Sequence, residues 1–293
     1  MAEYLKFDVP TPLSYFAALV ADDDNLLLLE AAASIAQDEF PEIDTQGVLA
    51  EVDLLADRLK RRIPADASLV QRLRLLGHFF FSELGFAGNV NDYYDPQNSF
   101  LHAVLKTRRG IPITLSLIYI ELAKHIGLQA RGIAFPGHFL VKLKMPAGDR
   151  YGEVVINPFT GQSLGREDLE DMLQPFRSRP GAHPDFEAPL GLYLQTAPPR
   201  DVLARLLRNL KEIHRSAQDW PRLLAVQQRL VVLLPSAWEE RRDRGLALAE
   251  LSRFAEALDD LEAYLQHGTA LADRSAIQRR AAELWQASRP RLH

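Results

Sequence analysis

The sequence predicts an α+β protein with a helical N-terminal part, a small α+β core and an all-helical C-terminal module. Three observations support this fold class. Apolar residues recur at helical spacing in residues 1–88, they alternate in short segments between residues 130 and 157, and helical spacing returns beyond residue 200. A buried helix beside a small antiparallel sheet makes the middle part an α+β arrangement.

The composition is that of a folded globular protein, and it excludes several functions. The chain has 293 residues, of which 47% are hydrophobic and 25% charged, so it can form a sizeable core. Its formal net charge is -5, without the basic excess that binding to nucleic-acid phosphates requires, so no nucleic-acid partner is expected. The absence of cysteine excludes disulfides, thiolate metal sites and a cysteine nucleophile.

The sequence also indicates where the protein resides and what it does not bind. The start, MAEYLKFDVP, lacks the features of a signal peptide, and no apolar run approaches the roughly 20 residues that span a bilayer. We therefore expect a cytoplasmic protein that does not bind membranes. The eight histidines show no paired metal-ligand spacing, and there is no phosphate-binding glycine loop, so neither a metal nor a cofactor is expected.

Three helices are predicted in the N-terminal part, residues 1–88, and the first extends over 25–37, where the run Asp22-Asp23-Asp24 favours its start. Apolar side chains recur at helical spacing over residues 48–59 and 69–80, after Asp44 and Asp66 respectively.

The segment from residue 89 to 177 changes character and is predicted to form the α+β core. After a polar, turn-rich stretch and a short helix over 99–107, an apolar helix runs from Ile113 to Ile126, with Pro112 before it and Gly127 after it. Three antiparallel strands joined by hairpin turns are then expected. They are Ala130–Phe135, His138–Met145 and Tyr151–Asn157.

A linker and a helical repeat complete the chain. Residues 178–199 hold five of the 18 prolines and show no regular period, which predicts a domain boundary. In the module over 200–293, Asp219-Trp220 aligns with Arg253-Phe254 at an offset of 34 residues, the period of tetratricopeptide repeats. Two repeats, at about 204–237 and 238–271, and a closing helix over 274–286 are therefore expected.

Three stretches resemble one bacterial family. The order DYYDPQNSFLHAVLKTRRGIPITLSLIYIELAKHIGL, PGHFLVKL and INPFTG is similar to that of the SirB-type family, in which a transglutaminase-like domain precedes tetratricopeptide repeats. The resemblance covers roughly residues 25–290. It implies a papain-like core in which enzymatic relatives carry a cysteine at the helix start, a histidine at a strand start and an aspartate at the next strand's end.

Carried over to this chain, the resemblance implies a degenerate triad. Counting back from Gly127 places Pro112 at the nucleophile position, while His138 matches the histidine and Asn157 the aspartate. Asparagine alone does not disable such a site, because a Cys-His-Asn arrangement works in papain-like proteases. Proline, however, has neither the thiol nor the hydroxyl that covalent acyl transfer needs. The chain is therefore expected to be a pseudoenzyme.

An alternative keeps an enzymatic function. Ser116 or Thr114, in the same helix, would replace the cysteine and act with His138 and Asn157 in a hydrolase or amidase. The simpler interpretation is that each hydroxyl bonds a carbonyl one turn earlier in the helix. The distance from each hydroxyl to the His138 ring distinguishes the two interpretations, since a nucleophile must lie about 3 Å from that ring. His138 itself is then left with a structural or a ligand-binding role.

The repeats indicate a protein or peptide partner. Stacked helix pairs form a concave face that receives an extended chain or a helix. Candidate residues on that face are Arg205, Arg208, Lys211 and Arg241, which would favour an acidic ligand. The competing possibility is that this face is buried. The sequence therefore predicts a non-catalytic interaction or regulatory scaffold.

Overall fold

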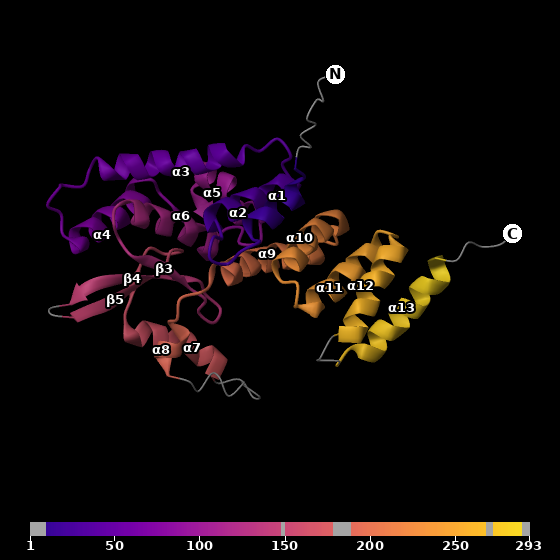
Figure 1. Ribbon diagram of the computed structural model, residues 1–293. Helices are drawn as coiled ribbons and strands as arrows, with labels where there is room; N and C mark the ends of the chain where they lie inside the picture. Colours follow the sequence, from indigo (N-terminus) through magenta and orange to yellow (C-terminus); the bar gives the residue numbers. More distant parts are fainter. Residues whose placement is uncertain (1–9, 148–149, 178–188, 268–271, 289–293) are drawn as a thin grey trace, which may run out of the picture. The chain divides into compact units, whose positions relative to one another are not determined.

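The computed structural model describes residues 10–147, 150–177, 189–267 and 272–288, and is mostly helical with a small antiparallel sheet (Figure 1). The chain divides into two compact units. The core unit comprises Leu27–Ala36 and Glu42–Leu206, and the repeat unit comprises Met1–Leu26, Gln37–Pro41 and Leu207–His293.

This division differs from the domain boundaries expected from the sequence. Residues 1–88 were expected to belong with the core, but the segments up to Leu26 and from Gln37 to Pro41 group with the C-terminal helices. The second boundary falls inside a helix, at residues 206–207, rather than in the predicted linker 178–199. Of that linker, residues 178–188 lie outside the described residues.

Helices make up the first half of the core unit. They are α2 (Leu28–Ser34), α3 (Thr45–Lys60), α4 (Leu69–Gly77), α5 (Leu101–Thr107) and α6 (Pro112–His125), with a π-helical turn at His78–Glu83 and a 3-10 turn at Pro96–Ser99. Another 3-10 turn, Ile35–Asp38, follows α2, and its last two residues belong to the repeat unit. The helix α4 begins at a capping box formed by Ser68 and Gln71, whose side chains bond each other's backbone N–H groups. Ser68 is therefore the cap of α4.

The helix α6 is the centre of the core unit. Pro112 occupies its first turn, where a missing N–H costs nothing, and Gly127 follows its end with a φ of 78°. Most side chains of α6 are buried on all sides, which agrees with the uninterrupted apolar pattern. It packs against α3 and against the sheet.

The sheet has four antiparallel strands in the order β3-β4-β5-β6. They are β3 (Ala130–Ile133), β4 (Leu140–Ala147), β5 (Arg150–Ile156) and β6 (Ser163–Leu164). A separate parallel pair, β1 (Ala87–Gly88) with β2 (Arg109–Gly110), lies before α6 in the chain.

The turn between β3 and β4 is longer than the sequence predicts. His138 was expected to begin a strand, but it lies two residues before β4. The reason is a β-turn in which the His138 N–H donates to the Phe135 carbonyl at 2.9 Å, with Gly137 at a φ of 70°. A Pro-Gly pair at the two central positions suits a type II turn.

Two further helices and the start of a third complete the core unit. They are α7 (Arg166–Arg177), α8 (Leu190–Tyr193) and the first turns of α9 (Pro199–Ser216). Between α8 and α9 the chain lies along β3, because Thr196 bridges to Ile133 and the Ala197 N–H donates to the Gly132 carbonyl at 2.9 Å. The predicted linker thus includes a helix and a bridge to the sheet.

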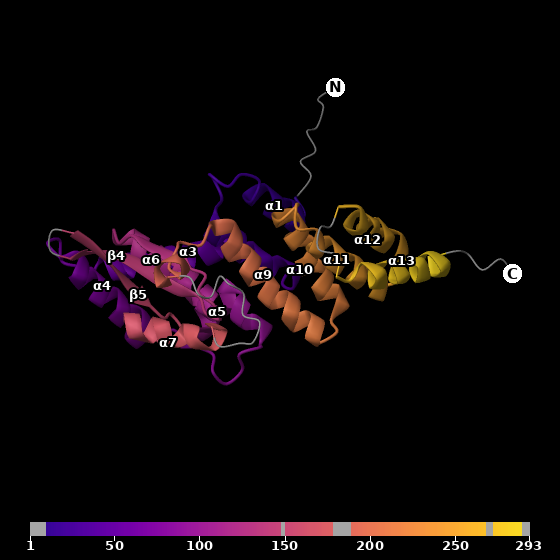
Figure 2. The same cartoon turned by 90° about the horizontal axis from the view of Figure 1, so that it is seen from below.

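The repeat unit contains the remaining helices (Figures 1 and 2). They are the rest of α9, α10 (Trp220–Leu233), α11 (Trp238–Glu250), α12 (Phe254–His267), α13 (Arg274–Ser288) and, from the N-terminal part, α1 (Pro12–Leu19). Their order matches the two predicted helix pairs and the closing helix. Gly245 allows α11 and α12 to approach closely, since a Cβ there would lie 3.0 Å from Leu261. Among the described residues, no helix is both long and apolar enough to cross a bilayer.

Candidate functional site

The register of the sheet places two of the three family positions at one end. Val141 in β4 pairs with Ile156 in β5. Because the strands are antiparallel, His138, just before β4, and Asn157, just after β5, lie at the same end of this ladder.

Backbone hydrogen bonds and strand pairing connect the start of α6 to the same end of the sheet. The Gly88 N–H donates to the carbonyl of Phe159, two residues beyond Asn157, at 3.0 Å. Gly88 in turn pairs with Gly110, and Pro112 follows two residues later as the first residue of α6. The backbone thus links all three family positions to one region of the core unit.

The side chain of Asn157 is engaged in local structure. Its Oδ1 accepts a hydrogen bond from the Phe159 N–H at 3.0 Å, and its own N–H donates to the Gln162 carbonyl at 2.8 Å. These bonds shape the turn between β5 and β6. Within the described ranges, no hydrogen bond joins Asn157 to His138.

His138 is half-buried, and in the described part of the chain its ring forms no hydrogen bond. Burial is the main reason that its pKa lies below the ordinary value, and the charge of Arg205 lowers it further. The imidazole is therefore neutral at neutral pH, with both ring nitrogens available to a ligand or to water.

The two alternative nucleophiles are both fully buried in α6. The Ser116 hydroxyl donates to the Pro112 carbonyl at 2.7 Å, one turn earlier. The Thr114 hydroxyl lies 2.8 Å from the Asn98 carbonyl and 3.0 Å from the Ile111 carbonyl. Each hydroxyl proton is thus directed at the backbone, which is the simpler of the two interpretations of these residues.

Arg205 lies in the core unit, although its sequence position suggests a place on the repeats. Its Nη1 donates to the Phe135 carbonyl at 3.4 Å, and its guanidinium lies 5.7 Å from the centre of the Phe139 ring. The positive charge of Arg205 also acts on Tyr93. Burial raises the pKa of the Tyr93 hydroxyl, and Arg205 offsets part of this increase. Helical spacing in the sequence does not predict the position of Arg205, because it does not indicate which unit the first turns of α9 belong to.

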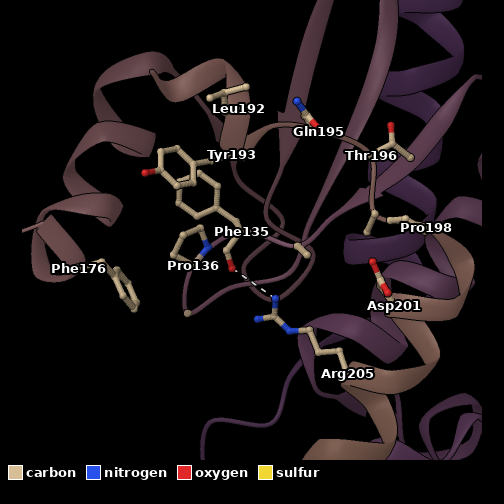
Figure 3. Close-up of a pocket in the computed structure, with 13 residues that line it drawn as sticks. Phe135, Pro136, Phe176, Leu192, Tyr193, Gln195, Thr196, Pro198, Asp201 and Arg205 are labelled. Carbon is tan, nitrogen blue, oxygen red and sulfur yellow. Dashed lines mark hydrogen bonds between the residues drawn. The ribbon is translucent and has the colours of Figure 1, made fainter. Parts of the chain in front are cut away.

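A pocket of about 570 Å³ adjoins this region (Figure 3). It lies between the turn before His138, the end of α7, α8 and the start of α9. Its apolar lining includes the side chains of Phe135, Pro136, Phe176, Leu192, Tyr193 and Pro198. Its charged lining residues are Asp201 and Arg205.

The other basic candidates lie in the repeat unit, and one of them is buried. Lys211 is only 7% exposed, and its ammonium binds Glu240 at 2.6 Å and Asp243 at 2.5 Å. Arg208 remains half-exposed while its Nε binds Glu240 at 2.8 Å. The Arg241 guanidinium lies 5.3 Å from the centre of the Trp238 ring. Lys211 therefore serves the packing of α9 against α11 rather than an open face.

No three His, Cys, Asp or Glu side chains within the described ranges are grouped so as to hold a metal ion.

Comparison with known proteins identifies both parts of the chain. Residues 46–208 match the transglutaminase-like superfamily, and residues 210–282 match the tetratricopeptide repeat. No solved structure matches the chain.

Named relatives occur in several bacteria. A UPF0162 protein of Xylella fastidiosa is 37% identical over 84% of this chain and 85% of its own length. A UPF0162 protein of Pseudomonas aeruginosa is 31% identical over 71% of this chain and 72% of its own. Protein SirB1 of Salmonella typhimurium is 28% identical over 80% of this chain and 83% of its own. The chain therefore belongs to the transglutaminase-like superfamily, among bacterial proteins in which this domain is followed by tetratricopeptide repeats.

Proposed function

We propose that this protein is a non-catalytic member of its superfamily that acts as a protein-interaction or regulatory scaffold. The observation that carries the proposal is that Pro112 begins α6 in a chain without cysteine. The resemblance to the family aligns this residue with the nucleophile. Acyl transfer through a covalent intermediate needs a thiol or a hydroxyl there.

The remaining polar groups support the same conclusion. The hydroxyls of Ser116 and Thr114 are buried and donate to backbone carbonyls, so activating either one requires breaking that bond and exposing the helix. His138 alone would contribute about 10²–10⁴-fold as a general base, which is small for amide cleavage.

The absence of covalent chemistry is tested with an active-site probe. A serine-directed fluorophosphonate should not label the purified protein, and the protein should neither incorporate amines into glutamine substrates nor release ammonia from amides. His138→Ala serves as the matched variant. Labelling of Ser116 or Thr114 in the wild type, lost in His138→Ala, would overturn the proposal and favour the hydrolase.

The repeat unit is the part that we propose to bind a protein or peptide partner. Stacked helix pairs in such arrays present extended binding surfaces. Of the basic candidates, Arg208 and Arg241 remain in the proposal, because Arg205 lies in the core unit and Lys211 is neutralised by two carboxylates. The partner surface they suit is acidic.

A capture experiment with matched variants tests this role. The wild type, immobilised as the full chain, is compared with the double variant Arg208→Gln/Arg241→Gln. Arg280→Gln is the control, since Arg280 is a partly exposed arginine on α13 with ion pairs to Glu250 and Glu283. A partner retained by the control and lost by the double variant supports the proposal. Equal capture by all three proteins removes these two residues from it.

A further inference from the structure

The pocket beside the β3–β4 turn combines an apolar wall with two opposite charges that do not pair with each other. Figure 3 shows Phe135, Pro136 and Tyr193 gathered on one side and Asp201 on another, with Arg205 reaching in toward the Phe135 carbonyl. A volume of about 570 Å³ is within the range of small-molecule sites, which are mostly apolar with a few placed polar groups.

Within the described residues, no carboxylate compensates the charge of Arg205. Its guanidinium is half-buried and meets one neutral carbonyl at 3.4 Å and one aromatic ring, but no carboxylate among the described residues. A hydrogen bond of that length is weak, and neither contact neutralises a cation. Partly burying a charge without a counter-ion is unfavourable, so its retention in a pocket indicates an anion supplied from outside.

Asp201 lies one helical turn before Arg205 on α9, on the same face. An acid four residues before a base is the favourable order for an ion pair on a helix. The structure nevertheless records no ion pair between them in the described part of the chain, because Arg205 extends to the Phe135 carbonyl instead. The pocket therefore presents one positive and one negative group separately.

The wall between α8 and α9 is held to the sheet by hydrogen bonds to its backbone. The Lys142 ammonium donates to the Leu194 carbonyl at 2.8 Å, and Ala197 donates to Gly132 at 2.9 Å. The bridge from Thr196 to Ile133 adds to these bonds. Such a wall keeps its shape without a ligand, which lowers the entropy cost of binding one.

We propose that this pocket binds a small zwitterion of the amino-acid type with apolar side chains, such as a dipeptide. Its carboxylate pairs with Arg205, whose planar fork suits a carboxylate. Its ammonium group pairs with Asp201, and its side chains lie against Phe135, Phe176 and Tyr193. The site goes beyond the scaffold role and does not depend on it, since every residue involved belongs to the core unit.

The test uses L-leucyl-L-phenylalanine as the probe and calorimetric titration of the full chain. The wild type should bind it saturably at one site. The C-terminal amide and the N-acetyl derivative of the same dipeptide should each bind at least tenfold more weakly, about 1.4 kcal/mol, because each removes one of the two charges.

Two variants assign each charge to its residue. In Arg205→Gln the dipeptide and its amide should bind equally, whereas in Asp201→Asn the dipeptide and its N-acetyl derivative should bind equally. Asp201 is exposed, so its variant is not expected to disturb folding. Arg166→Gln is the control and should bind like the wild type, since Arg166 is an exposed arginine at the other end of α7.

Two results would overturn the proposal. One is the absence of saturable binding up to about 10 mM dipeptide, roughly ten times the dissociation constant of a weak ligand, about 1 mM. The other is that folded Arg205→Gln and Asp201→Asn proteins still distinguish the three probes as the wild type does.

Discussion

Single residues determine the electrostatics at the end of the sheet where His138 lies. Arg205 is the cation that acts on both His138 and Tyr93, and burial acts on all three groups. For His138, burial and the neighbouring positive charge both disfavour the protonated ring. The pKa of this histidine is therefore lowered mainly by burial and further by the charge of Arg205, and the second contribution can be measured by removing that charge.

We expect Arg205→Gln to raise the pKa of His138 toward, but not up to, its ordinary value of 6.5, because burial is the larger cause and remains. A histidine-detected NMR titration of both proteins measures this shift. An unchanged pKa in a folded variant would show that the two side chains do not interact.

The same depressed pKa makes stability depend on pH with a definite sign. Between the folded pKa and 6.5 the unfolded chain binds a proton that the folded chain does not. Stability is therefore fully present above pH 6.5 and falls as the pH falls toward the folded pKa. His138→Gln should reduce this slope in urea unfolding. The substitution should not abolish the dependence of stability on pH, because burial also lowers the pKa of His102.

For single residues, the sequence predicts which residues belong to the site better than it predicts the contacts that they make. The resemblance to the family predicts Pro112, His138 and Asn157 as the triad positions. Backbone pairing at the ends of β4, β5 and β1 brings these three residues into one region. The sequence does not reveal that Lys211 is buried between two carboxylates of α11, since that contact depends on how two helices pack. For the same reason, the sequence does not reveal that Arg205 contacts Phe135 and Phe139.

Among the elements, the long ones are predictable and the short ones are not. The helices α3 and α6 and the strand order follow from apolar spacing that extends over many residues. The two-residue strands β1 and β2 leave no periodic signal, yet they connect the start of α6 to the end of β5. Their pairing depends on Gly88, where a Cβ would lie 2.2 Å from the Phe159 ring.

We expect Gly88→Ala to destabilise the core unit by about 1–3 kcal/mol, the usual cost of overpacking a tight contact. Gly77→Ala is the control, because a Cβ at that helical position meets nothing within 4 Å. It should be neutral or stabilise by about 0.5–1 kcal/mol. Urea unfolding of both variants measures the difference.

The ring is identified as the cause by a double variant. The effects of Gly88→Ala and Phe159→Ala should sum to more than the effect of the pair, because the second substitution removes the clash. If the free-energy changes of the two single variants add up to that of the double variant, the cost of Gly88→Ala does not come from contact with the Phe159 ring.

In the molecule as a whole, the two units are built from interleaved parts of the chain. The proline-rich stretch marks a boundary in composition, but the repeat unit also includes N-terminal segments that no local pattern connects to it. Within that unit Arg229 of α10 is fully buried, with its guanidinium over the Phe16 ring at 4.9 Å. Its Nε and Nη2 bind Asp38 at 2.5 and 2.9 Å. A contact across 191 residues is invisible to sequence periodicity.

Arg229→Ala is therefore expected to destabilise the repeat unit specifically. Removing one member of a buried ion pair leaves the other uncompensated and costs about 3–5 kcal/mol. Arg253→Ala is the matched control, because its pair with Glu256 is exposed and such pairs contribute at most about 1 kcal/mol. Amide hydrogen exchange followed by mass spectrometry should show lost protection in α1 and α10 of the Arg229 variant, with α6 unchanged, since cooperative units open separately. Equal loss of protection in α6 would mean that the chain opens as one unit, and an effect no larger than that of Arg253→Ala would mean that Arg229 does not hold the N-terminal segments in place.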